Sequence, residues 1–171
     1  MTLPRFAGAI AVGFLTLWSG CDSGLAPLNE PAGFRGVIRF KNWPPPDSVK
    51  ELRLVAFENF PSDSAGILPA LLAMKAVVYP PVGFSGFPTF LDSLEYEFTT
   101  KGTTLQVKKY DYVVIALRYG TNFFADWKPV GVYTTTPNSF IPAPVRVLLH
   151  RITPDIDFQV DFHNTPPKPW R

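Results

Sequence analysis

Alternation of apolar and polar residues runs through several short segments, and it limits the fold of this chain more than any other feature. The segment LEYEFT at 94–99 places Leu94, Tyr96 and Phe98 on one side and polar residues on the other. The segment DIDFQVDF at 155–162 repeats the pattern, with an apolar residue at every even position. Period-two alternation is typical of a β-strand that buries one face. The sequence therefore predicts strands that share a hydrophobic core.

Further segments read as strands, and turn signals separate them. GVIRFK at 36–41 alternates, whereas ELRLVAFE at 51–58 and DYVVIALRY at 111–119 are apolar on both faces in their middles, as central strands are. Two weaker candidates lie at 130–134 and 144–150. WPPPD at 43–47, TKG at 100–102 and TPN at 136–138 predict turns. With 19 prolines in 171 residues, we predict an all-β fold, a single antiparallel β-sandwich.

One segment departs from the strand pattern. ILPALLAMK at 67–75 favours a short helix, because Pro69 is acceptable in a first helical turn. The alternative is a hydrophobic crossover loop that lies over one end of the core.

The first 20 residues have the layout of a cleaved signal peptide. Arg5 precedes an uncharged apolar run from Phe6 to Trp18, which is about 13 residues long, and the small residues Ser19 and Gly20 follow. A membrane-spanning helix needs about 20 apolar residues. We therefore expect residues 1–20 to be removed rather than to remain as a transmembrane anchor.

The chain has one cysteine, Cys21, directly after this leader. Ser19-Gly20-Cys21 resembles the lipobox of bacterial lipoproteins, although Trp18 stands where the family usually has a leucine-like residue. The resemblance implies that Cys21 is lipidated, that it becomes the first residue, and that residues 21–33 form the lipidated cysteine and a tether. We expect a membrane-anchored protein of the bacterial cell envelope. The alternative is an ordinary cleaved signal with an incidental cysteine.

Residues 34–163 are expected to form the sandwich domain. Three stretches, GVIRFKNWPPPDSVKELRLVAF at 36–57, YEF at 96–98 and YDYVVIALRYG at 110–120, resemble the transthyretin-like sandwiches, which include the carboxypeptidase regulatory-like domains. An immunoglobulin-like sandwich is the alternative fold. The segment 61–93 is longer than the corresponding part of that family, and residues 164–171 form a proline-rich C-terminal tail.

Composition and motifs exclude several classes of function. One cysteine allows no internal disulfide, and one cysteine with two histidines cannot supply the four ligands of a structural zinc site. A net charge of +2 without a basic cluster gives no footprint for nucleic acid. The sequence has no G-x-S-x-G, phosphate-binding loop or H-E-x-x-H. We expect a non-catalytic protein without a metal or cofactor.

Acidic residues near the end of the chain are the best polar constellation. Asp155, Asp157, Asp161 and His163 share one parity, so they could line one face of a strand. We interpret them as a solvated sheet face, paired across to Arg146 or Lys108. The alternative is a metal-dependent hydrolase that uses Asp155, Asp157 and His163.

Aromatic residues in the predicted loops are the second candidate site. The candidate ligand-binding residues are Trp43, Phe84, Phe87, Phe124 and Trp127. Flat rings at a sandwich edge could stack on sugars or capture a partner protein, but they could equally close the ends of the core. The resulting expectation is a lipid-anchored binding or structural module with an envelope protein as a possible partner. The alternative is a glycan-binding accessory lipoprotein.

Overall fold

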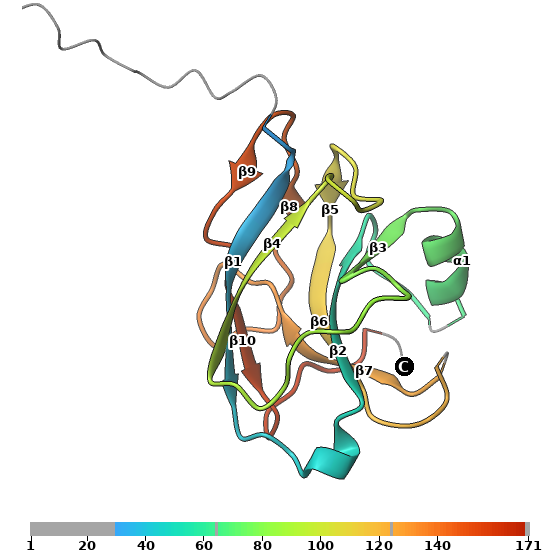
Figure 1. Ribbon diagram of the computed structural model, residues 1–171, viewed down its shortest axis with the longest axis vertical. Coiled ribbons are helices and arrows are strands. Elements are labelled where there is room, and N and C mark those ends of the chain that lie inside the picture. The colour runs from blue at the N-terminus through green and yellow to red at the C-terminus, as the bar shows by residue number, and fades with distance from the viewer. Residues whose placement is uncertain (1–29, 64, 124, 170–171) are drawn as a thin grey trace, which may run out of the picture.

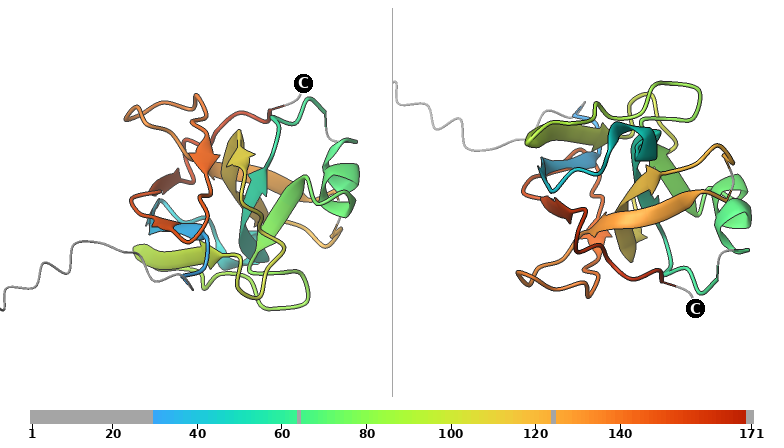
Figure 2. Two further views of the ribbon diagram at one scale, coloured as in Figure 1. Left: turned by 90° about the horizontal axis from the view of Figure 1, so that it is seen from above. Right: turned by 90° about the horizontal axis from the view of Figure 1, so that it is seen from below.

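The computed structural model describes residues 30–63, 65–123 and 125–169 of the chain, and they are mostly β-sheet (Figure 1). The first sheet contains β1 (Gly33–Lys41), β4 (Ser93–Thr99), β9 (Ile152–Thr153) and β10 (Phe158–Asp161). The second contains β2 (Glu51–Phe57), β3 (Ala76–Tyr79), β6 (Tyr112–Arg118) and β7 (Trp127–Val132). A short ribbon joins β5 (Lys109–Tyr110) to β8 (Val145–Arg146). The predicted all-β fold is confirmed, and two facing sheets are consistent with a β-sandwich (Figure 2).

The main core lies between the two sheets. Phe34, Phe98 and Phe158 from the first sheet meet Leu54 and Ile115 from the second, and all five are fully buried. The alternation predicted at 94–99 and 155–162 is confirmed at Tyr96 and Phe98 and at the even-numbered residues from 156 to 160, which are buried, whereas Thr99, predicted on the polar face, is buried as well. The apolar face of each strand therefore faces the opposite sheet.

Strand pairing differs from the prediction in the first sheet. β1 pairs antiparallel with β4, but β9 and β10 both lie parallel to β1. The segment between β9 and β10 crosses close to Gly36, where Ile156 donates its N–H to the carbonyl of Arg35 at 3.0 Å. The expectation of an antiparallel sheet throughout is therefore wrong at this edge.

Other strands differ in extent. β7 begins at Trp127 rather than at 130, and only β8 forms within 144–150. The helix predicted at 67–75 is confirmed as α1 (Ile67–Leu72), but it ends earlier, and Met74 has a φ of 54°. After this reversal and Lys75, the chain enters β3, which pairs with β2 inside the segment 61–93. A 3-10 helix, η1 (Pro46–Ser48), occupies the predicted turn before β2.

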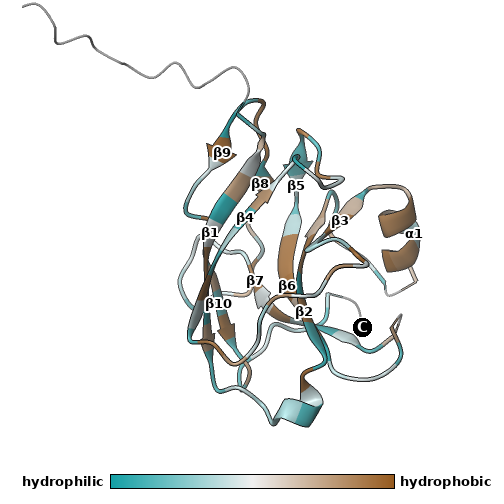
Figure 3. Ribbon diagram, in the orientation of Figure 1, coloured by the Kyte–Doolittle hydropathy of each residue, from teal (hydrophilic) through white to brown (hydrophobic). Residues whose placement is uncertain are grey.

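The second sheet is apolar on both faces, as predicted for central strands. Its outer face carries Phe57, Tyr112 and Val114, which form a second cluster with residues of α1. The helix lies against this outer face (Figure 2), and hydrophobic residues concentrate in α1 and β6 (Figure 3). The outer face of the second sheet is thus partly covered by α1.

The two ends of the chain differ in what the structure describes. The predicted signal peptide, Cys21 and the tether up to residue 29 lie outside the described residues. In the C-terminal tail Pro166 is buried, so residues 164–169 lie along the body of the domain. Within the described ranges, no helix is both long and apolar enough to span a membrane.

Candidate functional site: an apolar groove

A groove with a volume of about 390 Å³ lies on the outer face of the second sheet. Its floor is formed by side chains that point away from the main core. One wall is α1, and the other is the loop from β6 to β7. Its lining includes Val55, Val114, Ala116 and Pro129 on the floor, Leu68, Leu72, Val82, Phe123, Trp127 and Pro169 on the walls, and the polar side chains of Arg53, Tyr112 and Lys128. This volume falls within the range of about 300–1,000 Å³ that is usual for ligand pockets.

Small floor residues explain why the sheet is hollowed here. Ala116 of β6 lies opposite Pro129 of β7, next to an irregularity in the strand register after Ile115. Neither side chain extends far from the sheet. Proline is tolerated in β7 because β7 is an edge strand. The helix α1 covers the neighbouring part of the sheet, around Phe57 and Tyr112, and leaves the floor at Ala116 open.

The rim of the groove exposes large apolar side chains. Leu68 and Leu72 of α1 are 46% and 77% exposed, Val82 is 61% exposed, and Phe123 is 38% exposed. Single exposed apolar residues are ordinary, but several around one apolar hollow are typical of a binding site. This rim therefore marks the groove as the strongest candidate site among the described residues.

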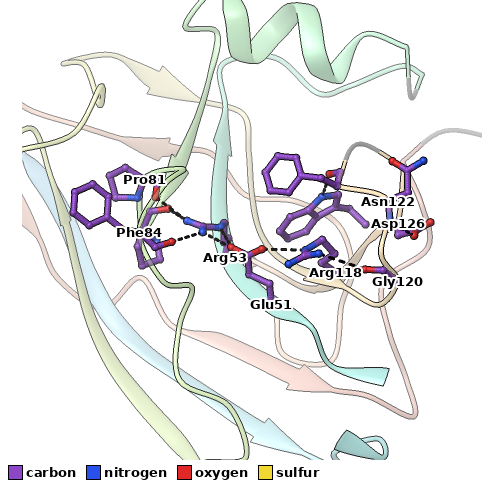
Figure 4. Close-up of polar contacts among 11 residues, drawn as sticks. Glu51, Arg53, Pro81, Phe84, Arg118, Gly120, Asn122 and Asp126 are labelled. Atoms are coloured by element: carbon purple, nitrogen blue, oxygen red, sulfur yellow. Dashed lines mark hydrogen bonds and ion pairs between the residues drawn. The ribbon is translucent and has the colours of Figure 1, made fainter. Parts of the chain in front are cut away.

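A buried arginine, Arg53, is among the residues that line the groove, and Figure 4 shows its polar contacts. Arg53 projects from the outer face of β2, and its side chain is only 4% exposed. It donates to the carbonyl of Pro80, to that of Pro81 at 2.9 Å and to that of Phe84 at 2.6 Å. It also forms an ion pair with Glu51. The guanidinium group thereby fixes the loop after β3 against the sheet.

The same carboxylate binds a second arginine. Arg118 of β6 lies opposite Glu51, and its Nε is 3.0 Å from the Glu51 Oε2 atom. Figure 4 shows Glu51 between Arg53 and Arg118. The Arg118 guanidinium in turn lies 5.8 Å from the centre of the Phe123 ring. The network links the floor of the groove to its loop wall.

Local hydrogen bonds hold the loop wall in shape. The indole Nε1 of Trp127 donates to the carbonyl of Phe123 at 2.6 Å, and the two rings are perpendicular. The Asp126 carboxylate accepts the backbone N–H of Asn122 at 2.8 Å. Phe123 in the loop and Trp127 at the start of β7 therefore hold each other in place beside the groove.

The charge of the lining is one-sided. Arg53 and Lys128 are its two charged residues, and the lining includes no acidic side chain among the described residues. Tyr112 is the other polar side chain there, and burial raises the pKa of its phenol above the usual value. The groove therefore combines apolar walls with positive charge.

The structure separates the candidate aromatic residues. Trp43 is half-buried at another place, stacked on Phe162, Phe40 and Phe90, and its Nε1 donates to the carbonyl of Leu91 at 2.8 Å. Phe87 belongs to the main core. Phe84 is 70% exposed, and only its carbonyl contacts Arg53. Trp127 lines the groove, and Phe124 lies outside the described residues. These rings do not form one stacking surface.

The acidic residues have local partners. Asp157 pairs with Arg39 at 2.8 Å and accepts the N–H of Val37 at 2.9 Å, while Lys108 pairs with Glu58 instead. The predicted partners Arg146 and Lys108 are therefore wrong for Asp157.

Asp161 accepts a hydrogen bond from the Asn42 side chain at 2.8 Å. Asp155 has a φ of 61° and lies outside β10. No group of three metal-ligating side chains occurs in the part of the chain that the structure describes.

Sequence reasoning missed the groove because its residues come from six separate segments, 53–57, 67–72, 78–82, 112–116, 123–129 and Pro169. The signal that could have indicated it is the apolar character of both faces of 51–58 and 111–119, which implies that something covers the second face. The single arginine in ELRLVAFE was a further signal, since a buried charge needs partners. Comparison with protein-family models, with curated proteins and with solved structures found no match for this chain.

Proposed function

We propose that this chain is a lipid-anchored protein of the bacterial cell envelope whose sandwich domain is a non-catalytic binding module. The binding site is the apolar groove between α1 and the β6–β7 loop. The observation that carries the proposal is the exposed apolar rim around a hollow of about 390 Å³. An apolar group that enters this groove gains burial at no cost in unpaired polar atoms.

The membrane attachment is supported by the sequence. The leader, the small residues before Cys21 and the position of Cys21 resemble a lipobox. The three stretches at 36–57, 96–98 and 110–120 support a transthyretin-like sandwich. In this proposal the domain works next to a membrane, where apolar ligands and partners are abundant.

Binding of Nile red, a neutral dye that fluoresces in apolar surroundings, tests the groove. We expect a saturable rise in emission with the full chain carrying Cys21→Ser, which has no acyl chain of its own. Leu72→Ser should weaken the dye's affinity several-fold, because Leu72 is 77% exposed on the rim. Its exposure makes a folding defect a poor explanation for that loss.

Leu149→Ser is the matched control, because Leu149 is 66% exposed and belongs to the segment between β8 and β9, away from α1 (Figure 1). It should leave the dye's affinity unchanged. Equal effects of the two substitutions, or an emission that never saturates, would contradict the proposal.

A further inference from the structure

We propose that the groove binds a single-chain amphiphile with an anionic head group, with its acyl chain over the sheet and its head at Lys128. This inference rests on the proposed function, since it names the class of ligand for the same groove. Two properties of the groove carry it. One is that no buried side-chain nitrogen or oxygen atom among the described residues lacks a hydrogen-bond partner, and the other is that Lys128 lines the groove without an ion pair in that part of the chain.

The apolar part suits a hydrocarbon chain better than a peptide. The one buried guanidinium there, that of Arg53, is committed to three carbonyl groups and Glu51. No buried side-chain nitrogen or oxygen atom lacks a hydrogen-bond partner among the described residues. A peptide backbone in the groove would lose hydrogen bonds to water without replacement, whereas an acyl chain has none to lose.

Lys128 supplies a positive charge that is not neutralised locally. Its ammonium lies 5.9 Å from the centre of the Tyr119 ring, and it has no ion pair within the described ranges. The Arg53 charge, by contrast, is offset by Glu51, which Arg118 shares. The charge complementary to this end of the groove is therefore negative.

A second cavity of about 400 Å³ adjoins at the same lysine. Lys128 lines both cavities, and the second is also lined by Ser48, Tyr119 and Lys168. Lys168 has no ion pair either within the described ranges. Its neighbour in the tail, Pro169, lines the apolar groove. Lys128 thus stands between the apolar groove and a second cavity that also contains the ammonium-bearing side chain of Lys168.

This arrangement matches the two halves of an amphiphile. The acyl chain would replace water on Val55 and on the exposed side chains of Leu72 and Val82, and the head group would remain hydrated beside the two lysines. A carboxylate or phosphate near an ammonium forms a charge-assisted hydrogen bond. A cationic head group would be repelled at the same place.

Displacement of Nile red by three ligands with the same sixteen-carbon chain tests the inference. The ligands are hexadecanoate, hexadecanol and hexadecyltrimethylammonium, each used below its micelle-forming concentration on the full chain with Cys21→Ser. We expect hexadecanoate to displace the dye at a concentration about ten-fold lower than hexadecyltrimethylammonium, with hexadecanol between them.

Lys128→Gln should remove most of the difference between the anionic and the cationic ligand. Lys101→Gln is the control, because Lys101 is exposed in the turn after β4 and should leave the difference intact. If the three ligands displace the dye equally, or if Lys128→Gln preserves their order, the preference for an anionic head group is contradicted. The proposal of an apolar binding site would still hold.

Absence of dye binding would instead contradict the proposed function itself. Size-exclusion chromatography of the ligand-free chain distinguishes one further case. A stable dimer that releases Nile red as it forms would show that a second copy of the chain occupies the groove. That result would contradict the proposal that the groove binds an amphiphile.

Discussion

Arg53 joins parts of the chain that are distant in sequence. It lies in the middle of β2, where the neighbouring residues Leu52 and Leu54 enter the main core. Its own side chain points to the other face and binds carbonyl groups at 80, 81 and 84. The sequence ELRLVAFE predicted a central strand but could not indicate these acceptors, because they belong to a loop about 30 residues further along.

Arg53→Met should lower the free energy of unfolding by about 3–5 kcal/mol. The substitution removes the donor to the carbonyl groups of Pro80 and Phe84 and one partner of the ion pair with Glu51, and removing one partner of a buried ion pair costs about this much. Arg53→Lys keeps the charge but loses the planar fork, so we expect a smaller loss of about 1–3 kcal/mol. Urea denaturation measures both. Wild-type stability in Arg53→Met would contradict the structural role.

Asp157 gives stability that depends on pH. Burial acts to raise the pKa of this carboxyl, but hydrogen bonds from Arg39 and Val37 outweigh burial and lower the pKa below its usual value. A lowered pKa in the folded state means that Asp157 stabilises the fold above its unfolded pKa of about 3.9. That contribution disappears as the pH falls through the folded pKa.

Asp157→Asn should therefore cost about 0.5–1 kcal/mol at pH 7, a value kept small because the pair is well exposed. The difference from wild type should shrink below pH 4. Urea denaturation at pH 7 and pH 3 measures this. Asp47→Asn is the control, since Asp47 is exposed and has no ion pair within the described ranges. If the stability difference between Asp157→Asn and wild type grows at low pH, the pKa of Asp157 is not lowered in the folded state.

At the scale of elements, strands were predicted better than their pairing. Alternation in 94–99 and 155–162 reports which face of a strand is buried, and that depends on each strand alone. Strand pairing depends on which strands become neighbours in the folded sheet. β10 lies parallel to β1 because the chain crosses at Gly36, and nothing in the local pattern of 155–162 indicates that crossing.

Gly36 permits this close approach. A Cβ atom at this position would lie 2.2 Å from the carbonyl oxygen of Ile156 and 2.5 Å from its carbonyl carbon. Both are backbone atoms, and Tyr96 donates to the same carbonyl at 2.6 Å. The backbone at Ile156 therefore has little freedom to move away.

Gly36→Ala should lower the free energy of unfolding by about 1–3 kcal/mol, as overpacking in a core does. Gly66→Ala is the control, because the nearest atom to its added Cβ is the Asp63 carboxylate oxygen at 3.3 Å, at the end of an exposed side chain. We expect a clearly smaller effect there. Thermal or urea unfolding compares the two, and equal losses would mean that the crossing at Gly36 is not tight.

At the scale of the whole molecule, the sequence predicted the class of fold but not the candidate site. Of the candidate residues with a described position, Trp127 alone lines the groove. The others were chosen because they are aromatic and lie near turn signals, and that criterion does not separate core residues such as Phe87 from exposed ones such as Phe84. The groove depends on how α1 covers the second sheet, which is a property of the tertiary structure.

The proposed membrane attachment at Cys21 would set where such a groove works. Eight residues separate Cys21 from Glu30, so even a fully extended tether spans roughly 30 Å. A domain held by Cys21 would stay within that distance of the bilayer surface. Ligands that leave the bilayer would then meet the groove at a high local concentration.

Cys21→Ser should release the protein from the membrane fraction. Two or more acyl chains hold a protein to a bilayer far better than one, and without the thiol no diacylglyceryl group can be attached. Cell fractionation and intact mass of the purified protein measure the two consequences. The wild-type mass should exceed that of residues 21–171 by the attached lipid.

Ser23→Ala is the control, because it changes a neighbouring small residue and leaves the cysteine in place. It should stay in the membrane fraction with the same added mass of lipid. If Cys21→Ser remains in the membrane with an unchanged mass apart from the substituted atom, Cys21 is not the anchor. Another part of the chain would then hold the protein at the membrane, and the limit of roughly 30 Å between the domain and the bilayer would no longer apply.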